Sequence, residues 1–87
     1  MSGQEIETIG MRIRAARGYR RNSQVDLAKR IGLSKTALSQ IETGVTEDPR
    51  SSVVLNVARV LGVNGNYLLG LSERIEPEKD LKTAEAA

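Results

Sequence analysis

The fold is decided by residues 23–44, which read SQVDLAKRIGLSKTALSQIETG. Each half of this stretch starts with a serine and ends with a glycine, the usual order of helix N-cap and C-terminal stop. The pattern predicts two short helices, from Gln24 to Ile31 and from Lys35 to Thr43. Because so few residues join them, the second helix must cross the first steeply instead of lying antiparallel to it.

A steep crossing of two helices constrains the residues at the joint. It needs a small side chain where the backbones approach, which Ala28 supplies, and a turn residue that tolerates positive φ, which Gly32 supplies. Leu38 and Ile41 then point inward from the second helix. These four residues are the expected structural positions of the pair.

The remainder of the chain continues in helical periods, without the alternation typical of strands. The other expected helices are Glu5 to Tyr19, with apolar Ile6, Ile9, Ile13 and Ala16; Ser51 or Ser52 to Leu61, with apolar Leu55, Ala58 and Leu61; and a short one capped by Asn64, with Tyr67, Leu68 and Leu69. The fold class is therefore all-α, a compact five-helix bundle within residues 1–71. Residues 72–87 are charged and are expected to form a flexible tail.

Charge is unevenly distributed along the chain, although the total is only +2. Residues 12–35 hold eight basic side chains against one acidic one, whereas residues 51–87 hold four basic and five acidic ones. Arg12, Arg14 and Arg20 fall outside the apolar line of the first helix and are expected to face solvent or phosphate. The asymmetry suits a polyanionic partner, although arginines that merely solvate a helix would give the same count.

Composition argues against several classes of function. Cysteine and histidine are both absent, which leaves no disulfide, no usual zinc ligand set and no Cys or His nucleophile. The chain shows no nucleophile–base pair, no secretory signal and no stretch near the roughly 20 apolar residues that span a bilayer. We therefore expect a protein without enzymatic activity, metal or cofactor that acts in the cytoplasm.

The quoted stretch resembles the helix-turn-helix of the lambdoid phage repressor and Cro family, the XRE-type transcriptional regulators, with the motif at Gln24 to Thr43. The likeness continues through PRSSVVLNVARVLGV and NGNYLLG, and it covers Ile9 to Gly70 without a gap. It implies a sequence-specific double-stranded DNA-binding regulator of phage or prophage type. Such a protein would repress transcription by binding a palindromic operator as a homodimer. The apolar, non-cationic segment Val63 to Leu71 is the expected dimer contact.

The resemblance also implies roles for individual residues. The expected base contacts are Lys35, Thr36, Ser39 and Gln40, and the expected phosphate contact at the start of the motif is Gln24. Arg17 and Glu42 match a family pair that ties the first helix to the third. Both side chains would point into the bundle, so we interpret this pair as structural.

Two turns depart from the family pattern. Acidic Glu47 and Asp48 stand in the loop where relatives often carry cations, so the phosphate contact there is expected to fall to Arg50 or to backbone amides. Arg21 and Asn22 replace the usual glycine and apolar residue between the first two helices. Asn22 is expected to take the left-handed conformation and Arg21 to add a phosphate contact.

Two other functions stay open. An antitoxin would share the DNA-binding core and wrap a toxin with residues 72–87, which a toxin-sized reading frame beside the gene would favour. A protein-interaction domain that has lost DNA binding would explain the acidic loop. Titration with duplex DNA at two salt concentrations separates the latter from a DNA-binding protein.

Overall fold

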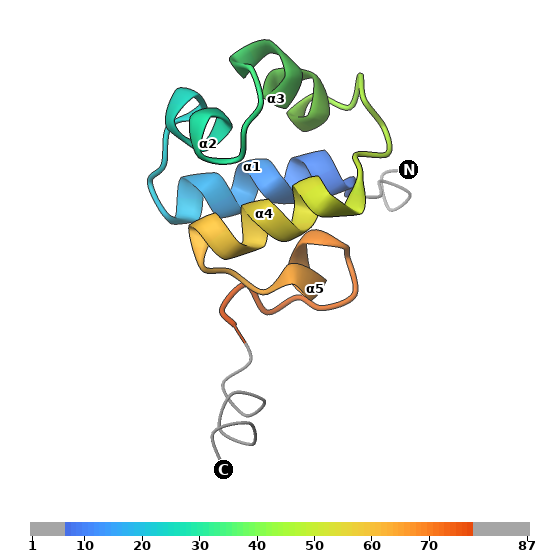
Figure 1. The fold of residues 1–87 in the computed structure, drawn as a ribbon. Coiled ribbons are helices and arrows are strands. Elements are labelled where there is room, and N and C mark those ends of the chain that lie inside the picture. The colour runs from blue at the N-terminus through green and yellow to red at the C-terminus, as the bar shows by residue number, and fades with distance from the viewer. Residues whose placement is uncertain (1–6, 78–87) are drawn as a thin grey trace.

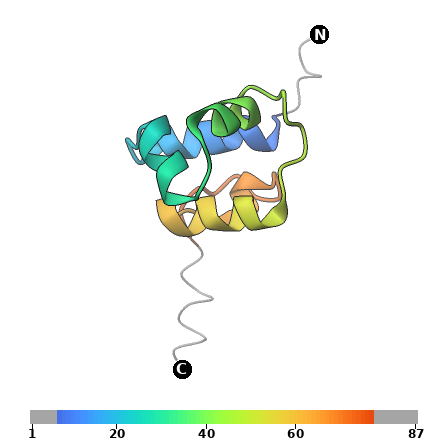
Figure 2. The same ribbon diagram turned by 45° about the horizontal axis from the view of Figure 1, so that its top comes forward.

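A computed structural model describes residues 7–77, and within that range it contains five helices and no strand (Figure 1). The helices are α1 (Ile9–Tyr19), α2 (Gln24–Arg30), α3 (Lys35–Glu42), α4 (Ser51–Leu61) and α5 (Gly65–Leu68). In Figure 1, α2 and α3 lie at one end of the molecule, α1 and α4 run through its middle, and α5 lies at the other end. The turned view of Figure 2 shows α3 beside α1 and α5 beside α4. The predicted all-α five-helix bundle is confirmed. None of these helices is long and apolar enough to cross a membrane.

Polar caps start the helices as the sequence predicts. The hydroxyl groups of Ser23 and Ser34 each accept a hydrogen bond of 3.0 Å from the backbone N–H three residues later. The side chain of Asn64 accepts one of 3.1 Å from the N–H two residues later. The turn after α2 passes through Gly32 with φ of 75°, which confirms the need for glycine at this joint. The helices α2 and α3 each end one residue earlier than predicted.

The first helix starts later than predicted. The expected start at Glu5, like Ile6, lies outside the described residues, and Glu7 and Thr8 are not helical. Thr8 is the N-cap, and its hydroxyl accepts a hydrogen bond of 3.1 Å from the backbone N–H of Met11. The backbone of Thr8 is extended, as an N-cap requires and as a β-branched residue favours. The helix therefore starts after Thr8, although the apolar periodicity of the sequence predicts an earlier start.

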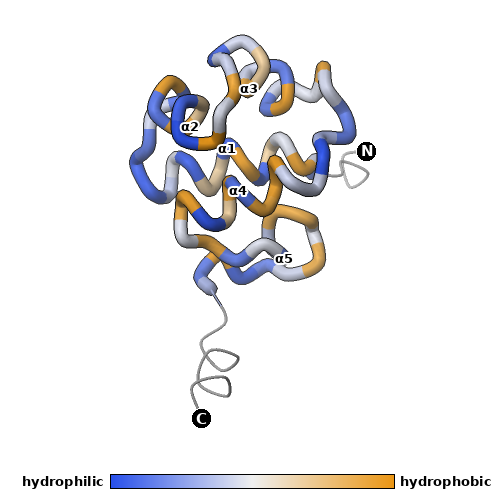
Figure 3. Tube along the Cα trace, in the orientation of Figure 1, coloured by the Kyte–Doolittle hydropathy of each residue, from blue (hydrophilic) through white to orange (hydrophobic). Residues whose placement is uncertain are grey.

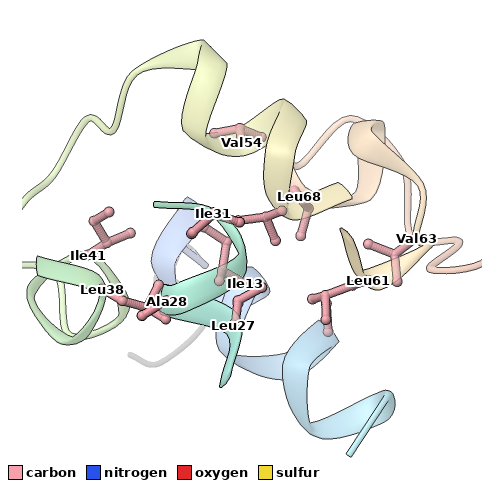
Figure 4. Close-up of a cluster of buried hydrophobic side chains, with 12 residues drawn as sticks. Ile13, Leu27, Ala28, Ile31, Leu38, Ile41, Val54, Leu61, Val63 and Leu68 are labelled. Carbon is pink, nitrogen blue, oxygen red and sulfur yellow. The ribbon is translucent and has the colours of Figure 1, made fainter. Parts of the chain in front are cut away.

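All five helices and the turn before α5 contribute to one core (Figure 4). The buried apolar residues are Ile13, Ala16, Leu27, Ala28, Ile31, Leu38, Ile41, Val54, Val57, Leu61, Val63 and Leu68. Ala28, Leu38 and Ile41, the expected inward residues of the crossing pair, are among them. Aliphatic side chains fill this centre, and the partly buried Tyr67 packs against it.

The inward face of α4 differs from the prediction. Leu55 is 58% exposed and Ala58 is only partly buried, whereas Val54 and Val57 are buried together with the expected Leu61. Apolar residues cover more than half of the circumference of this helix, so periodicity alone left the choice of face open. Contacts with α1, α2 and α5 select the face.

Arg12 of α1 and Arg20, the residue that caps the end of α1, hold the C-terminal strap, which we define as residues 72–77. Arg12 is only 7% exposed and donates hydrogen bonds of 3.0 Å to the carbonyls of Tyr67 and Ser72. It also donates one of 2.9 Å to the carboxylate of Glu73, which raises the pKa of the guanidinium above its ordinary value. The expectation that Arg12 faces solvent or phosphate was therefore wrong: its apolar stem allows burial once its N–H groups find carbonyl and carboxylate acceptors.

Arg20 and Asn64 complete the attachment of the strap. Arg20 donates to the carbonyls of Leu61 and Gly62 and to the carboxylate of Glu76, at 2.9, 2.7 and 3.2 Å, so it too is engaged within the protein instead of facing phosphate. Asn64 donates from its backbone to Ile75 and from its side chain to Arg74. Residues 72–77 of the predicted tail are therefore hydrogen-bonded to the bundle, and residues 78–87 lie outside the described residues.

The backbones of α1 and α3 come into close contact at Gly10. A Cβ atom there would lie 1.8 Å from the carbonyl oxygen of Ile41 and 3.1 Å from the Cα of Glu42. The sequence analysis assigned the small residue of the fold to Ala28, which is indeed buried, but it missed this second position. A glycine inside an apolar helical period was the available signal, since such a glycine usually has a packing reason.

We predict that Gly10→Ala lowers the free energy of unfolding by at least about 1–3 kcal/mol, because the methyl group meets rigid backbone. Gly18→Ala is the matched control on the same helix, where nothing lies within 4 Å of the added Cβ. The control should be neutral or stabilising by up to about 1 kcal/mol. Thermal denaturation followed by circular dichroism measures both. A Gly10→Ala protein that melts no lower than the wild type would contradict this α1–α3 crossing.

Candidate nucleic-acid interface

The outer face of α3 and the start of α2 together form a shallow polar hollow of about 190 Å³. Its lining residues are Gln24, Lys35, Thr36, Ser39 and Gln40. The structure thus brings the four predicted base-contacting residues together with the predicted phosphate contact at the start of the motif. The opposite face of α3 is buried in the core through Leu38 and Ile41, so the hollow is the side of this helix that a partner can reach.

The first turn of α3 concentrates positive potential at this hollow. Lys35 and Thr36 are exposed, and the first turn contains no acidic residue. A cation beside the positive end of a helix dipole is mildly unfavourable for folding. The arrangement therefore favours an anionic partner, which relieves that repulsion when it binds.

Fewer basic residues are available to a partner than the sequence count suggests. Arg12, Arg17 and Arg20 are engaged inside the protein, and Arg30 pairs with Asp26 at 3.3 Å in an exposed bridge. Within the described residues 7–77, four of the eight basic side chains of residues 12–35 form no ion pair: Arg14, Arg21, Lys29 and Lys35. The positive surface is thus narrower than predicted.

An ion pair with a buried carboxylate and a partly buried arginine joins α1 to α3. Arg17 donates to the two carboxylate oxygens of Glu42 at 2.9 and 3.0 Å, and to the carbonyl of Asn22 at 3.1 Å. The predicted tie between the two helices is therefore present, with bidentate geometry. One contact was not predicted: the side-chain amide of Gln24 donates a hydrogen bond of 3.0 Å to the same carboxylate.

The turn between α1 and α2 carries its strain on a different residue from the one predicted. Arg21 has φ of 55°, and Asn22 is not among the residues with positive φ. The N–H of Arg21 bonds to the carbonyl of Gly18, and that of Asn22 to the carbonyl of Arg17, which is the Schellman pattern with its left-handed position at Arg21. Arg21 is exposed on a hydrophilic turn, visible as a continuous blue stretch in Figure 3.

The loop before α4 extends the same surface. Gln40 also lines a larger hollow, of about 430 Å³, to which Arg50 and Asp48 contribute. Arg50 is exposed at the start of α4, so it lies on a surface that continues from the α3 hollow. Glu47 and Asp48 are exposed in this loop. The two acidic side chains that depart from the family pattern therefore lie on the surface of the protein.

Two short helices that cross at a glycine turn, with a buried inner face and a polar outer face on the second, define a helix-turn-helix protein. The family model described as "Helix-turn-helix domain" matches residues 8–68. The chain belongs to this family. The resemblance to the lambdoid repressors is thereby confirmed.

Solved structures of the P22 c2 repressor and of SinR are similar to most of the chain. The P22 c2 repressor in complex with a synthetic operator is 34% identical, with a TM-score of 0.67 over 77% of this chain and 100% of that one. SinR, described as a master regulator for biofilm formation and solved in complex with DNA, is 33% identical, with a TM-score of 0.66 over 70% and 97%. The SinR–SinI complex, at 30% identity and a TM-score of 0.68, covers 91% of this chain and 78% of that one. SinR is a Bacillus subtilis protein. No curated protein sequence matched the chain.

We predict that Arg21→Gly raises the free energy of unfolding by about 1 kcal/mol, because glycine removes the cost of a side chain in the left-handed region. Asn22→Gly is the control at the neighbouring position, where φ is not positive and no such gain is available. Chemical denaturation of both variants gives the comparison. Stabilisation by Asn22→Gly but not by Arg21→Gly would show that the turn has been assigned to the wrong residue.

Proposed function

We propose that the protein is a transcriptional repressor that binds a palindromic operator in double-stranded DNA as a homodimer, with α3 in the major groove. The observation that carries this proposal is the polar hollow on α3 and the start of α2. The major groove of B-DNA admits one α-helix, and the early residues of the second helix of this motif are those that contact base edges. The complexes with DNA described for the P22 c2 repressor and SinR support the proposal.

Each residue of the hollow has a chemical role in this proposal. Lys35 donates to guanine O6 and N7, and Thr36 offers a methyl group to thymine. Ser39 and Gln40 lie one turn further on and contact deeper positions or the adjoining backbone. Gln24 contacts a phosphate, helped by the positive end of α2.

Two further cations supply phosphate contacts in this proposal. Arg21 is exposed before α2, and Arg50 is exposed at the start of α4 beside a hollow that Gln40 also lines. These contacts fix the register of the protein on the duplex without reading its sequence. The repressor is of the phage or prophage type and acts on the nucleoid in the cytoplasm. Its proposed action needs neither a cofactor nor a catalytic group.

Only part of the segment Val63 to Leu71, the proposed dimer contact, is accessible to a second copy. Val63 and Leu68 are buried in the core, whereas Leu69 and Leu71 are 47% and 74% exposed. These two leucines are therefore the apolar groups that a second copy can cover. Two copies joined there by a two-fold axis would set their α3 helices about 34 Å apart, one turn of DNA.

Selection of binding sites from random duplexes tests the proposal. We expect a palindromic consensus with half-sites about 10 base pairs apart. A purified protein that binds neither the selected pool nor nonspecific duplex at low salt would overturn DNA binding. A non-palindromic consensus would overturn the homodimer alone.

We predict that Lys35→Ala reduces discrimination at one base position of each half-site by about 1–3 kcal/mol. Gln24→Ala should instead weaken binding by a similar factor for every sequence, because a phosphate contact carries no base information. Competition binding with single-base variants of the selected site gives both patterns. If the two variants lost affinity equally for all sequences, α3 would not be reading bases through Lys35.

We also predict that Arg21→Gly lowers the salt dependence of DNA binding by about 0.9 in the slope of log K against log salt concentration. The loss of affinity would accompany the gain in stability predicted above. Arg74→Ala is the control, since it removes an exposed cation from the strap at the far end of the molecule. Affinity titrations at several salt concentrations measure the slopes. Equal slopes for wild type and Arg21→Gly would remove Arg21 from the phosphate contacts.

An antitoxin remains the second candidate, and one comparison favours a protein partner. The SinR–SinI complex, which matches the largest part of this chain among the structures above, is described as a complex between two proteins. Residues 72–77 are engaged with the bundle, so a toxin would have to bind residues 78–87 or a surface of the bundle itself. Co-purification from cells that carry the neighbouring genes, with a toxin as the partner, would favour the antitoxin.

A further inference from the structure

We propose that Glu42 is a positioning residue for DNA recognition, which acts by fixing the side-chain amide of Gln24 before DNA arrives. This inference rests on the proposed DNA binding through α3. It gives the ion pair between Arg17 and Glu42 a second role, because the family resemblance assigned that pair to the scaffold alone. The observation behind it is that one carboxylate binds both Arg17 and a residue of the hollow.

The carboxylate of Glu42 lies directly behind the hollow. Its side chain is 3% exposed and stands at the last residue of α3. Oxygen Oε1 accepts from Nη2 of Arg17 and from Nε2 of Gln24, both at 3.0 Å, while Oε2 accepts from Nε of Arg17 at 2.9 Å. Gln24 is only partly buried and belongs to the first turn of α2, so its amide spans the distance from the buried pair to the surface.

A carboxylate restricts the orientation of a glutamine amide. A glutamine can present either its oxygen or its nitrogen to a neighbour, but an ionised carboxylate only accepts hydrogen bonds. Glu42 therefore binds one of the two N–H groups of Nε2 and excludes the flipped amide, whose oxygen would face the carboxylate. The carbonyl oxygen and the second N–H of Gln24 form no other hydrogen bond within residues 7–77 and remain for a partner in the hollow.

This fixed orientation suits a phosphate contact. Phosphate oxygens accept hydrogen bonds and would repel the amide oxygen, so the phosphate contact has to use the second N–H of Nε2, which Glu42 does not take. Fixing the rotamer in the free protein also removes conformational entropy that binding would otherwise cost. The negative charge of Glu42 does not repel the DNA strongly, because Arg17 neutralises it and burial keeps it from the surface.

A double-mutant cycle on operator binding tests the proposal. In Glu42→Gln the new amide can donate as well as accept, so Gln24 is released from its orientation. We expect Glu42→Gln to weaken DNA binding about five-fold in the wild-type background and less than about two-fold in the Gln24→Ala background. Equal losses in the two backgrounds would overturn the positioning role and leave Glu42 as scaffold.

Arg17→Lys is the control for loss of stability. It weakens the same ion pair, because lysine lacks the fork that binds a carboxylate at two points, but it leaves Glu42 to hold Gln24. We expect this variant to melt at a lower temperature and yet to bind DNA within about two-fold of the wild type well below that temperature. A loss of affinity as large as that of Glu42→Gln would show that the bundle, and not the amide, is responsible.

Side-chain NMR relaxation tests the inference on the wild-type protein, should Glu42→Gln fail to fold. Gln40 lines the same hollow, is exposed and forms no side-chain hydrogen bond within residues 7–77, so it is an internal reference. We expect the amide order parameter of Gln24 to be near rigid-backbone values and that of Gln40 below about 0.6. Equal mobility would overturn the inference even if DNA binding is intact. A wild-type protein that binds no DNA would instead overturn the proposed function on which the inference rests.

Discussion

The carboxylate of Glu42 is the point on which the arrangement of α1, α2 and α3 depends. Arg17 approaches it from the end of α1, Gln24 from the start of α2, and Glu42 itself closes α3. Removing one partner of a buried ion pair leaves an uncompensated charge, which costs several kcal/mol, about 3–5 in typical cases. The ends of these helices therefore cannot shift independently. The surface that would meet DNA is assembled from the same helix ends, so its shape follows from this pair.

Close backbone contact complements the ion pair. Gly10 lets α1 touch the backbone of α3 at Ile41, beside the residue that carries the carboxylate. A side chain at that position would push the helices apart and lengthen the contacts of Arg17 with Glu42. Packing at Gly10 and charge pairing at Glu42 thus require the same distance between α1 and α3. Because both interactions agree, they favour a single arrangement of the bundle.

Local chemistry was predictable from the sequence, whereas the choice among equivalent faces was not. The caps at Ser23 and Ser34 and the turn at Gly32 depend on a few neighbouring atoms, and they were predicted correctly. The inward face of α4 depends on which neighbours cover it, so Leu55 was chosen where Val54 is buried.

Prediction of the functional surface likewise succeeded for some residues and failed for those whose position depends on distant contacts. The residues of the hollow were assigned by the family resemblance, and the structure brings all of them together. The burial of Arg12 could not be predicted from the sequence, because its acceptors at Tyr67, Ser72 and Glu73 lie at least 55 residues away along the chain. The left-handed residue proved to be Arg21, because the hydrogen bonds that end α1 place that conformation one residue earlier than side-chain preference suggested.

The arginines of α1 and its C-cap have two structural roles. Arg12 and Arg20 hold the strap and the segment around α5, where the proposed dimer contact lies, while Arg17 holds the end of α3. A change in the strap can therefore alter how two copies meet without moving the residues that face DNA within one copy. In the proposed dimer, the contacts of one half-site would depend on Arg17 and α3, and the spacing between half-sites would depend on Arg12, Arg20 and the strap. Substitutions in one set would then adjust one property and leave the other intact.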